Sequence, residues 1–188
     1  MCHKTALTLL FHGSPLFEGY KSSVLIMVPT KNIEEIMCEE IILMFREKGF
    51  ELKVMGQCHL NTRILIFNRK ALEEDIYSKD RFEFLQGYGY SIMPLDSMLN
   101  ELTKRLNNCD IPFPHEVGIF LGYPLEDIQG FIKNKAQNYS LSGYWKVYSN
   151  KEKTRIVFDN YRKSRKKNIN KYINGVAFSD ILEGEKIV

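Results

Sequence analysis

A histidine and a carboxylate stand side by side in a segment bounded by prolines. His115 and Glu116 follow Pro114, and Gly122 and Tyr123 come shortly after them. An imidazole beside a carboxylate has the chemistry of an acid–base pair, which a hydrolase or a transferase needs. The alternative is a structural role, with Glu116 near the start of a helix and His115 bound to backbone groups. This pair, or His115 with a more distant carboxylate, is our candidate for catalysis.

A run of aromatic residues follows later in the chain. In an extended strand, Trp145 and Val147 would share one face, and Tyr144, Lys146 and Tyr148 would share the other. One face should belong to the core. The other face could form a platform on which a ligand ring stacks beside a basic group.

Our leading hypothesis combines these segments in one open surface of an accessory or ligand-binding protein. The small, aromatic and ionisable residues concentrate there in a way that a core does not demand. The surface would contain His115, Glu116, Gly122, Tyr123, Trp145, Lys146 and Tyr148.

Positive charge is concentrated near the end of the chain. Residues 151–175 contain nine Lys or Arg against two acids, although the whole chain has a net charge of only +3. Such a cluster binds phosphate groups and gives nucleic acids a salt-sensitive affinity. The same segment has an apolar stripe, so a packed helix with a solvated basic face is the alternative. The candidate phosphate-binding or nucleic-acid-binding residues are Arg162, Lys163, Arg165, Lys166 and Lys167.

Other motifs that carry chemistry are missing or poorly spaced. The chain holds neither GxGxxG nor GxxxxGK[ST], the loops that cradle phosphates. Cysteine and histidine are directly adjacent at 2–3 and 58–59, whereas structural zinc sites place two ligands two to four residues apart. Cys109 is a candidate nucleophile only if the fold brings a base to it. We therefore predict no metal site, and no motif identifies a cofactor.

Length and composition favour one globular domain over residues 1–188. Hydrophobic residues make up 44% of the chain and charged residues 26%, as in ordinary globular proteins. The four cysteines include no CxxC pair, which suits a reducing compartment. No apolar stretch approaches the roughly 20 residues of a membrane span. We expect a soluble, cytoplasmic protein with no membrane partner.

The framework that must position these residues is predicted to be an α+β fold. It would be a small mixed sheet of short strands, packed with several helices on one face. We expect helices at 32–48, 70–78, 80–86, after Pro94, after Pro124, at 151–174 and at 178–182. We expect strands at 50–54, 63–68 and 143–148 and a loop at 56–62, while the apolar run 22–29 is a buried strand or a short helix.

Three segments of the chain resemble a known family. They are FHGSPLFEGYKSSVL at 11–25, PHEVGIFLGYPLEDIQGFI at 114–132 and GYWKVYSNKEKTRIVFDNYRKS at 143–164. They resemble domain of unknown function family 3793 (DUF3793), a group of small cytosolic proteins from anaerobic Gram-positive bacteria. The resemblance runs from His12 to about Leu182, and its middle segment is the most specific part.

The resemblance implies no established activity. Relatives whose genes neighbour those of flavodoxins or iron-uptake proteins imply a link to redox or iron physiology, which is an association and not a mechanism. Relatives also carry cysteines near the positions of Gly13, 140–142 and Ser164, where this chain has none. A thiol-based or metal-based role is therefore in doubt for this member. The partner stays open between a redox-related or iron-related protein and a nucleic acid.

Overall fold

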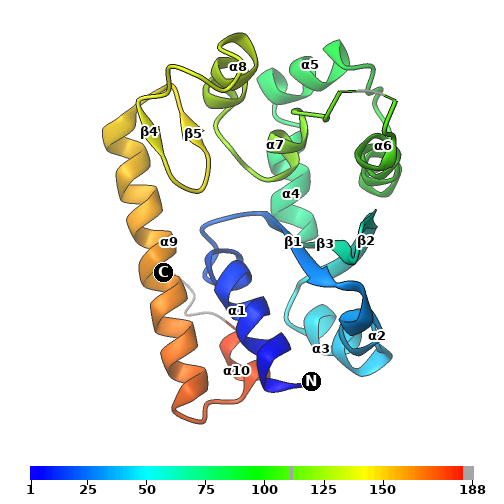
Figure 1. The fold of residues 1–188 in the computed structure, drawn as a ribbon, viewed down its shortest axis with the longest axis vertical. Helices are drawn as coiled ribbons and strands as arrows, with labels where there is room; N and C mark the ends of the chain where they lie inside the picture. The colour runs from blue at the N-terminus through cyan, green and yellow to red at the C-terminus, as the bar shows by residue number, and fades with distance from the viewer. Residues whose placement is uncertain (111, 184–188) are drawn as a thin grey trace.

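The centre of the molecule is a three-stranded antiparallel sheet (Figure 1). The computed structural model describes residues 1–110 and 112–183. The strands are β1 (Ser23–Pro29), β2 (Glu51–Cys58) and β3 (Asn61–Phe67), in the order β1-β3-β2. The ambiguous run at 22–29 is thus a strand, and its alternate residues Val24, Ile26 and Val28 share one buried face.

The central strand of this sheet, β3, is buried on both faces over Ile64–Phe67. Successive side chains of β3 point to opposite faces, so Ile64 and Ile66 join one apolar cluster while Leu65 and Phe67 join the other. The α+β class is confirmed. The expected mixed sheet with helices on one face is wrong, because every strand pairing in the described residues is antiparallel. A central strand this apolar also needs cover on both sides.

Two sets of helices provide that cover, one below and one above the sheet in Figure 1. The lower set is α1 (His3–Phe17), η1 (Thr30–Asn32), α2 (Ile33–Ile36), α3 (Glu39–Glu47) and α10 (Phe178–Ile181). The upper set is α4 (Arg69–Ile76), α5 (Lys79–Gly87), α6 (Leu95–Asn107) and α7 (Val117–Phe120). The described fold is completed by α8 (Leu125–Lys133), β4 (Leu141–Ser142), β5 (Lys146–Val147) and α9 (Lys151–Ile173), which packs along α1.

Most of the expected helices are confirmed. The apolar stripe of α6 is buried throughout, because its members recur on one face of the helix. That stripe consists of Leu95, Met98, Leu99, Leu102 and Leu106. The basic helix α9 runs to Ile173, and Gly175 follows it with a φ of 90°. Glycine tolerates this left-handed backbone, so it ends the helix at little cost.

The helix expected at 32–48 is wrong in its continuity. The chain forms η1, α2 and α3 in succession, and Cys38 between α2 and α3 has an extended backbone. Each of the two α-helices begins with a pair of glutamates, at 34–35 and 39–40. Acidic residues stabilise the positive end of a helix dipole, so the second pair marks a new helix start.

The loop expected at 56–62 is also wrong. Strand β2 continues to Cys58 and β3 begins at Asn61, which leaves a tight turn. The register shifts between Val54 and Gln57, so a bulge bends the strand there. The sequence of this stretch is polar because this end of the hairpin is exposed, and polarity alone does not distinguish an exposed strand from a loop.

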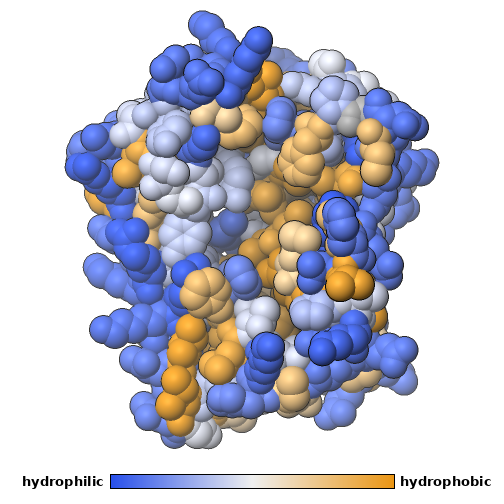
Figure 2. Space-filling model, in the orientation of Figure 1, coloured by the Kyte–Doolittle hydropathy of each residue, from blue (hydrophilic) through white to orange (hydrophobic). Residues whose placement is uncertain are grey.

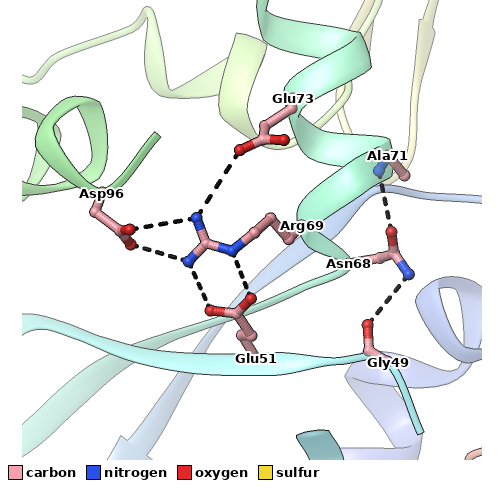
Figure 3. A network of polar contacts seen from close by, with 7 residues as sticks. All are labelled: Gly49, Glu51, Asn68, Arg69, Ala71, Glu73 and Asp96. Atoms are coloured by element: carbon pink, nitrogen blue, oxygen red, sulfur yellow. Dashed lines mark hydrogen bonds and ion pairs between the residues drawn. The ribbon is translucent and has the colours of Figure 1, made fainter. Parts of the chain in front are cut away.

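One arginine joins β2, α4 and α6 (Figure 3). Arg69 donates from Nε and Nη2 to the two carboxylate oxygens of Glu51, over 2.6 and 2.8 Å. It also donates from Nη1 and Nη2 to Asp96, over 3.3 and 3.1 Å. The preceding Asn68 caps α4 by accepting a hydrogen bond from the backbone N–H of Ala71. This network fixes the start of α4 against the sheet.

Replacing Arg69 with methionine is expected to lower the free energy of unfolding by about 1–2 kcal/mol at pH 7, since two paired carboxylates lose their donor at a partly exposed site. Hydrogen bonds from Arg69 lower the pKa of Asp96. This stabilisation is present above the pKa of the unfolded chain, about 3.9. It is lost as the pH falls through the lower folded pKa. Urea denaturation at pH 7 and pH 3 measures the effect, and the difference should shrink at pH 3.

Arg155→Met is the matched control for this measurement. It removes an exposed pair with Glu152 within α9 and should change stability by less than about 0.5 kcal/mol. Equal losses of unfolding free energy in the two variants, or a larger loss in Arg69→Met at pH 3 than at pH 7, would contradict the stabilising role of the Arg69 network.

Candidate functional site

The candidate site is centred on a small hairpin between α8 and α9 (Figure 1). Strands β4 and β5 pair antiparallel, with Leu141 opposite Val147. Only part of the strand expected at 143–148 is therefore extended. The backbone N–H of Gly143 donates to the carbonyl of Trp145, so the residues between β4 and β5 form a tight turn.

A buried carboxylate holds the hairpin on α8. Asp127 lies in the first turn of α8 and is only 2% exposed. Its Oδ1 accepts hydrogen bonds from the backbone N–H groups of Tyr148 and Ser149, both over 2.7 Å. Its Oδ2 accepts from Nε1 of Trp145, also over 2.7 Å. Three donors and the positive end of α8 compensate the buried negative charge.

The tryptophan held in this way is the centre of an aromatic group. Tyr123 stacks on Trp145 with ring centroids 5.0 Å apart, and Phe158 packs nearly perpendicular to Trp145 with ring centroids 4.6 Å apart. Tyr144 packs between Phe158 and Tyr161 of α9. Rings in such arrangements contribute more than their buried area alone. The aromatic group therefore fixes the hairpin against both α9 and the loop between α7 and α8.

The hairpin can approach α9 and α8 closely because two positions lack a side chain. A Cβ atom at Gly143 would lie 2.3 Å from the ring of Phe158. A Cβ atom at Gly130 would lie 2.5 Å from Cβ of Tyr148. Both distances are far below normal contact, so any larger residue would push the hairpin away from its supports.

These contacts enclose a pocket of about 340 Å³ between the hairpin, α7 and α8. Aromatic rings and apolar side chains make up most of its wall. Figure 2 shows pale side chains, of intermediate hydropathy, gathered over the hairpin. The pocket is lined by His115, Val117, Gly118, Tyr123, Asp127, Ile128, Phe131, Ser142, Gly143, Tyr144, Trp145 and Lys146.

Four residues of the predicted surface meet in this pocket: His115, Tyr123, Trp145 and Lys146. The edge of the His115 ring faces Phe131, with centroids 5.0 Å apart. The Lys146 ammonium donates to the carbonyl of Ala136 over 2.7 Å. The imidazole and the ammonium thus join Asp127 and Ser142 as the polar groups of a wall that is otherwise aromatic and apolar.

Glu116 does not reach the pocket. It is 2% exposed, and its Oε1 lies 3.4 Å from Nη1 of Arg105 on α6. The arginine also contacts the ring of Tyr90, whose pKa is raised by burial and by the charge of Glu116. The expected cleft with His115 and Glu116 as partners is therefore wrong. The two residues stand at a helical turn, where neighbouring side chains point in different directions.

Two further members of the predicted surface also lie outside the pocket. Gly122 has a φ of 68° and turns the chain toward Asp75 and Ser22. The Cβ of Tyr148 packs against Gly130, and its hydroxyl is buried with no hydrogen-bond partner in residues 1–110 and 112–183. Gly122 therefore shapes the loop, and Tyr148 helps to position the hairpin.

The five basic residues of α9 do not form one surface. The guanidinium of Arg165 lies 3.7 Å from the ring centre of Phe11, and Lys167 forms an ion pair with Glu18. Both side chains join α9 to the α1 region. Arg162 pairs with Asp159 within the helix, while Lys163 and Lys166 are exposed. Arg165 and Lys167 therefore pack α9 against α1.

The sequence did not identify Asp127, Phe131 or Ser142 as members of the site. An acid in the first turn of a helix normally points to solvent and stabilises the helix dipole, so its position alone gives Asp127 no role in a site. A usable signal lay in the combination of this acid with a downstream tryptophan, whose indole N–H needs a partner when buried. Phe131 and Ser142 carry no sequence signal for a pocket.

The fold and site define a small α+β protein with an aromatic pocket beside a hairpin. The family model described as a protein of unknown function (DUF3793) matches residues 9–182. The chain therefore belongs to this family, as its three segments indicated. No curated protein and no solved structure gives a significant match.

No helix in the described part of the chain is long and apolar enough to cross a membrane. No three His, Cys, Asp or Glu side chains within it converge as a metal-binding group. The link to iron or redox physiology stays a prediction.

Replacing Asp127 with asparagine is expected to lower the free energy of unfolding by about 2 kcal/mol, because an amide N–H₂ group would then face a backbone or indole donor. The emission of Trp145, the single tryptophan of the chain, should also shift to longer wavelength as the ring loosens. Urea denaturation followed by circular dichroism and by fluorescence measures both effects.

The neighbouring Glu126→Gln variant is the control, since Glu126 is exposed on the same helical turn. It should stay within about 0.5 kcal/mol of the unmodified protein and keep its emission maximum. If both variants behave alike, Asp127 does not hold the hairpin.

Proposed function

We propose that the protein is a cytoplasmic binding protein whose ligand is a small planar ring compound with one negatively charged group. The observation that carries this proposal is the aromatic pocket of about 340 Å³. Pockets for small ligands start at about 300 Å³, and they combine apolar walls with a few polar groups that orient the ligand. A ring system of one or two fused rings suits this space.

The walls favour a flat ligand. Tyr123 and Trp145 stack on each other. The His115 ring contacts Phe131 and Phe113, with ring centroids 5.0 and 5.7 Å away. Ring faces and edges attract further rings through offset stacking and edge contacts. An aliphatic ligand would fill the same volume without using these contacts.

The polar groups favour a negative charge on the ligand. The Lys146 ammonium gives one of its three N–H donors to the carbonyl of Ala136, so two donors can serve a ligand. The Asp127 carboxylate would repel an anion, but its charge is compensated by three hydrogen bonds from the hairpin. His115 can add a further donor from its ring. A carboxylate or phosphate on the ligand would therefore be directed toward Lys146.

The single tryptophan permits a direct test. Titration with 1-naphthoate, a two-ring carboxylate, is expected to change the emission of Trp145 with a saturable curve. Lys146→Met should weaken the apparent affinity about tenfold or more, because a hydrogen bond to a charged group contributes about 1.5–3 kcal/mol. Lys163→Met, at an exposed position on α9, is the matched control and should leave the curve unchanged.

Two results would reject this proposal. One is a linear emission change that never saturates, as collisional quenching gives. The other is an equal loss of affinity in Lys146→Met and Lys163→Met.

A further inference from the structure

A lysine without a carboxylate partner lies behind the aromatic wall. Lys21 follows the turn after α1, and its ammonium stands over the rings of Tyr123 and Tyr161, at 5.1 and 5.8 Å from their centres. Its side chain is only partly exposed. No carboxylate in residues 1–110 or 112–183 forms an ion pair with it. The described contacts of its ammonium are with the faces of these two rings.

Lys21 also lines a second hollow, of about 360 Å³. One acidic group there is already compensated, since Asp75 accepts a 2.5 Å hydrogen bond from the Ser22 hydroxyl and lies 3.4 Å from Arg81. In contrast to the aromatic pocket, the lining of this hollow is polar. It consists of Gly19, Tyr20, Lys21, Ser22, Ala71, Glu74, Asp75 and Gly122.

This environment disfavours the charged form of the amine. Burial lowers the pKa of Lys21 to about 8. The phenols that face it, on Tyr123 and Tyr161, have pKa values raised by burial and stay neutral. The remaining ionisable groups around the hollow are Tyr20, Glu74 and Asp75. About a tenth of Lys21 is then the neutral amine at pH 7, against under about 0.1% for an ordinary lysine.

We propose that Lys21 is a reactive amine that forms an imine with small hydroxylated aldehydes entering this polar hollow. The amine nitrogen attacks the carbonyl carbon and forms a C–N bond, which gives a carbinolamine. The C–O bond then breaks, and the former carbonyl oxygen leaves as water with the two hydrogens of the amine. The step involves no change in redox state and needs no further reactant.

The lining determines the class of aldehyde. The Ser22 hydroxyl and the carboxylates of Glu74 and Asp75 can bind hydroxyl groups of a ligand, whereas they offer nothing to an alkyl chain. A neutral amine that lacks an ion-pair partner is the form from which Schiff bases are made. The hollow and the amine thus select for a short, polar carbonyl compound.

The test uses the full chain, glycolaldehyde and sodium cyanoborohydride, whose hydride reduces an imine to a stable secondary amine. Peptide mass analysis then gives the labelling rate at each lysine. Lys21 is expected to react roughly tenfold faster at pH 7 than Lys70, whose side chain is 89% exposed. The gain from the neutral fraction is partly offset by the lower nucleophilicity of a less basic amine.

The pH profile gives a second, independent readout. Labelling at Lys21 should level off above about pH 8, while labelling at Lys70 should keep rising toward pH 10. Lys21→Arg should remove only the fast site, and circular dichroism checks that the variant folds. Equal rates at Lys21 and Lys70, or identical pH profiles, would overturn the proposal. Lys146→Met should leave labelling at Lys21 unchanged, so this result is separate from ligand binding in the aromatic pocket.

Discussion

The arrangement of the candidate site depends on one buried carboxylate that accepts three hydrogen bonds. Asp127 joins α8 to the indole of Trp145 and to the backbone after β5. Without it, the hairpin would keep its ring contacts, the Lys146 hydrogen bond to Ala136 and the packing of Tyr148 on Gly130, but it would lose its three hydrogen bonds to α8. A two-stranded hairpin of this length is not stable alone in water. The pocket therefore exists because α8 supplies an anchor.

The central sheet serves a different purpose, since it separates two cores. One core lies between the sheet and α1, α2, α3 and α10, and the other lies between the sheet and α4 to α7. The Arg69 network fastens the start of α4 to β2 and α6 from the outside (Figure 3). The loop that carries Gly122 and Tyr123 lies beside α4, as the contact of Gly122 with Asp75 shows. The rigid sheet thereby sets the position of one pocket wall.

The sequence predicted those features that depend on the residues of a single helix or strand. The stripe of α6 and the end of α9 at Gly175 follow from helical spacing and from the backbone freedom of glycine. The meeting of His115 with Trp145 was also expected. The role of Asp127 was not, because a hydrogen bond across 18 residues depends on how two elements pack. The side chains of His115 and Glu116 point in different directions because of a local turn of the backbone. Their adjacency in the sequence does not predict this turn.

The anchoring of the hairpin by a single side chain also has a dynamic consequence. Strand β3 is covered on both faces, so its amide hydrogens should exchange with solvent only when most of the protein unfolds. The amides of Tyr148 and Ser149 need only the release of one carboxylate to meet water. Local opening of the hairpin would then widen the entrance to the pocket while both cores stay intact. A ligand larger than the closed cavity could enter by that route.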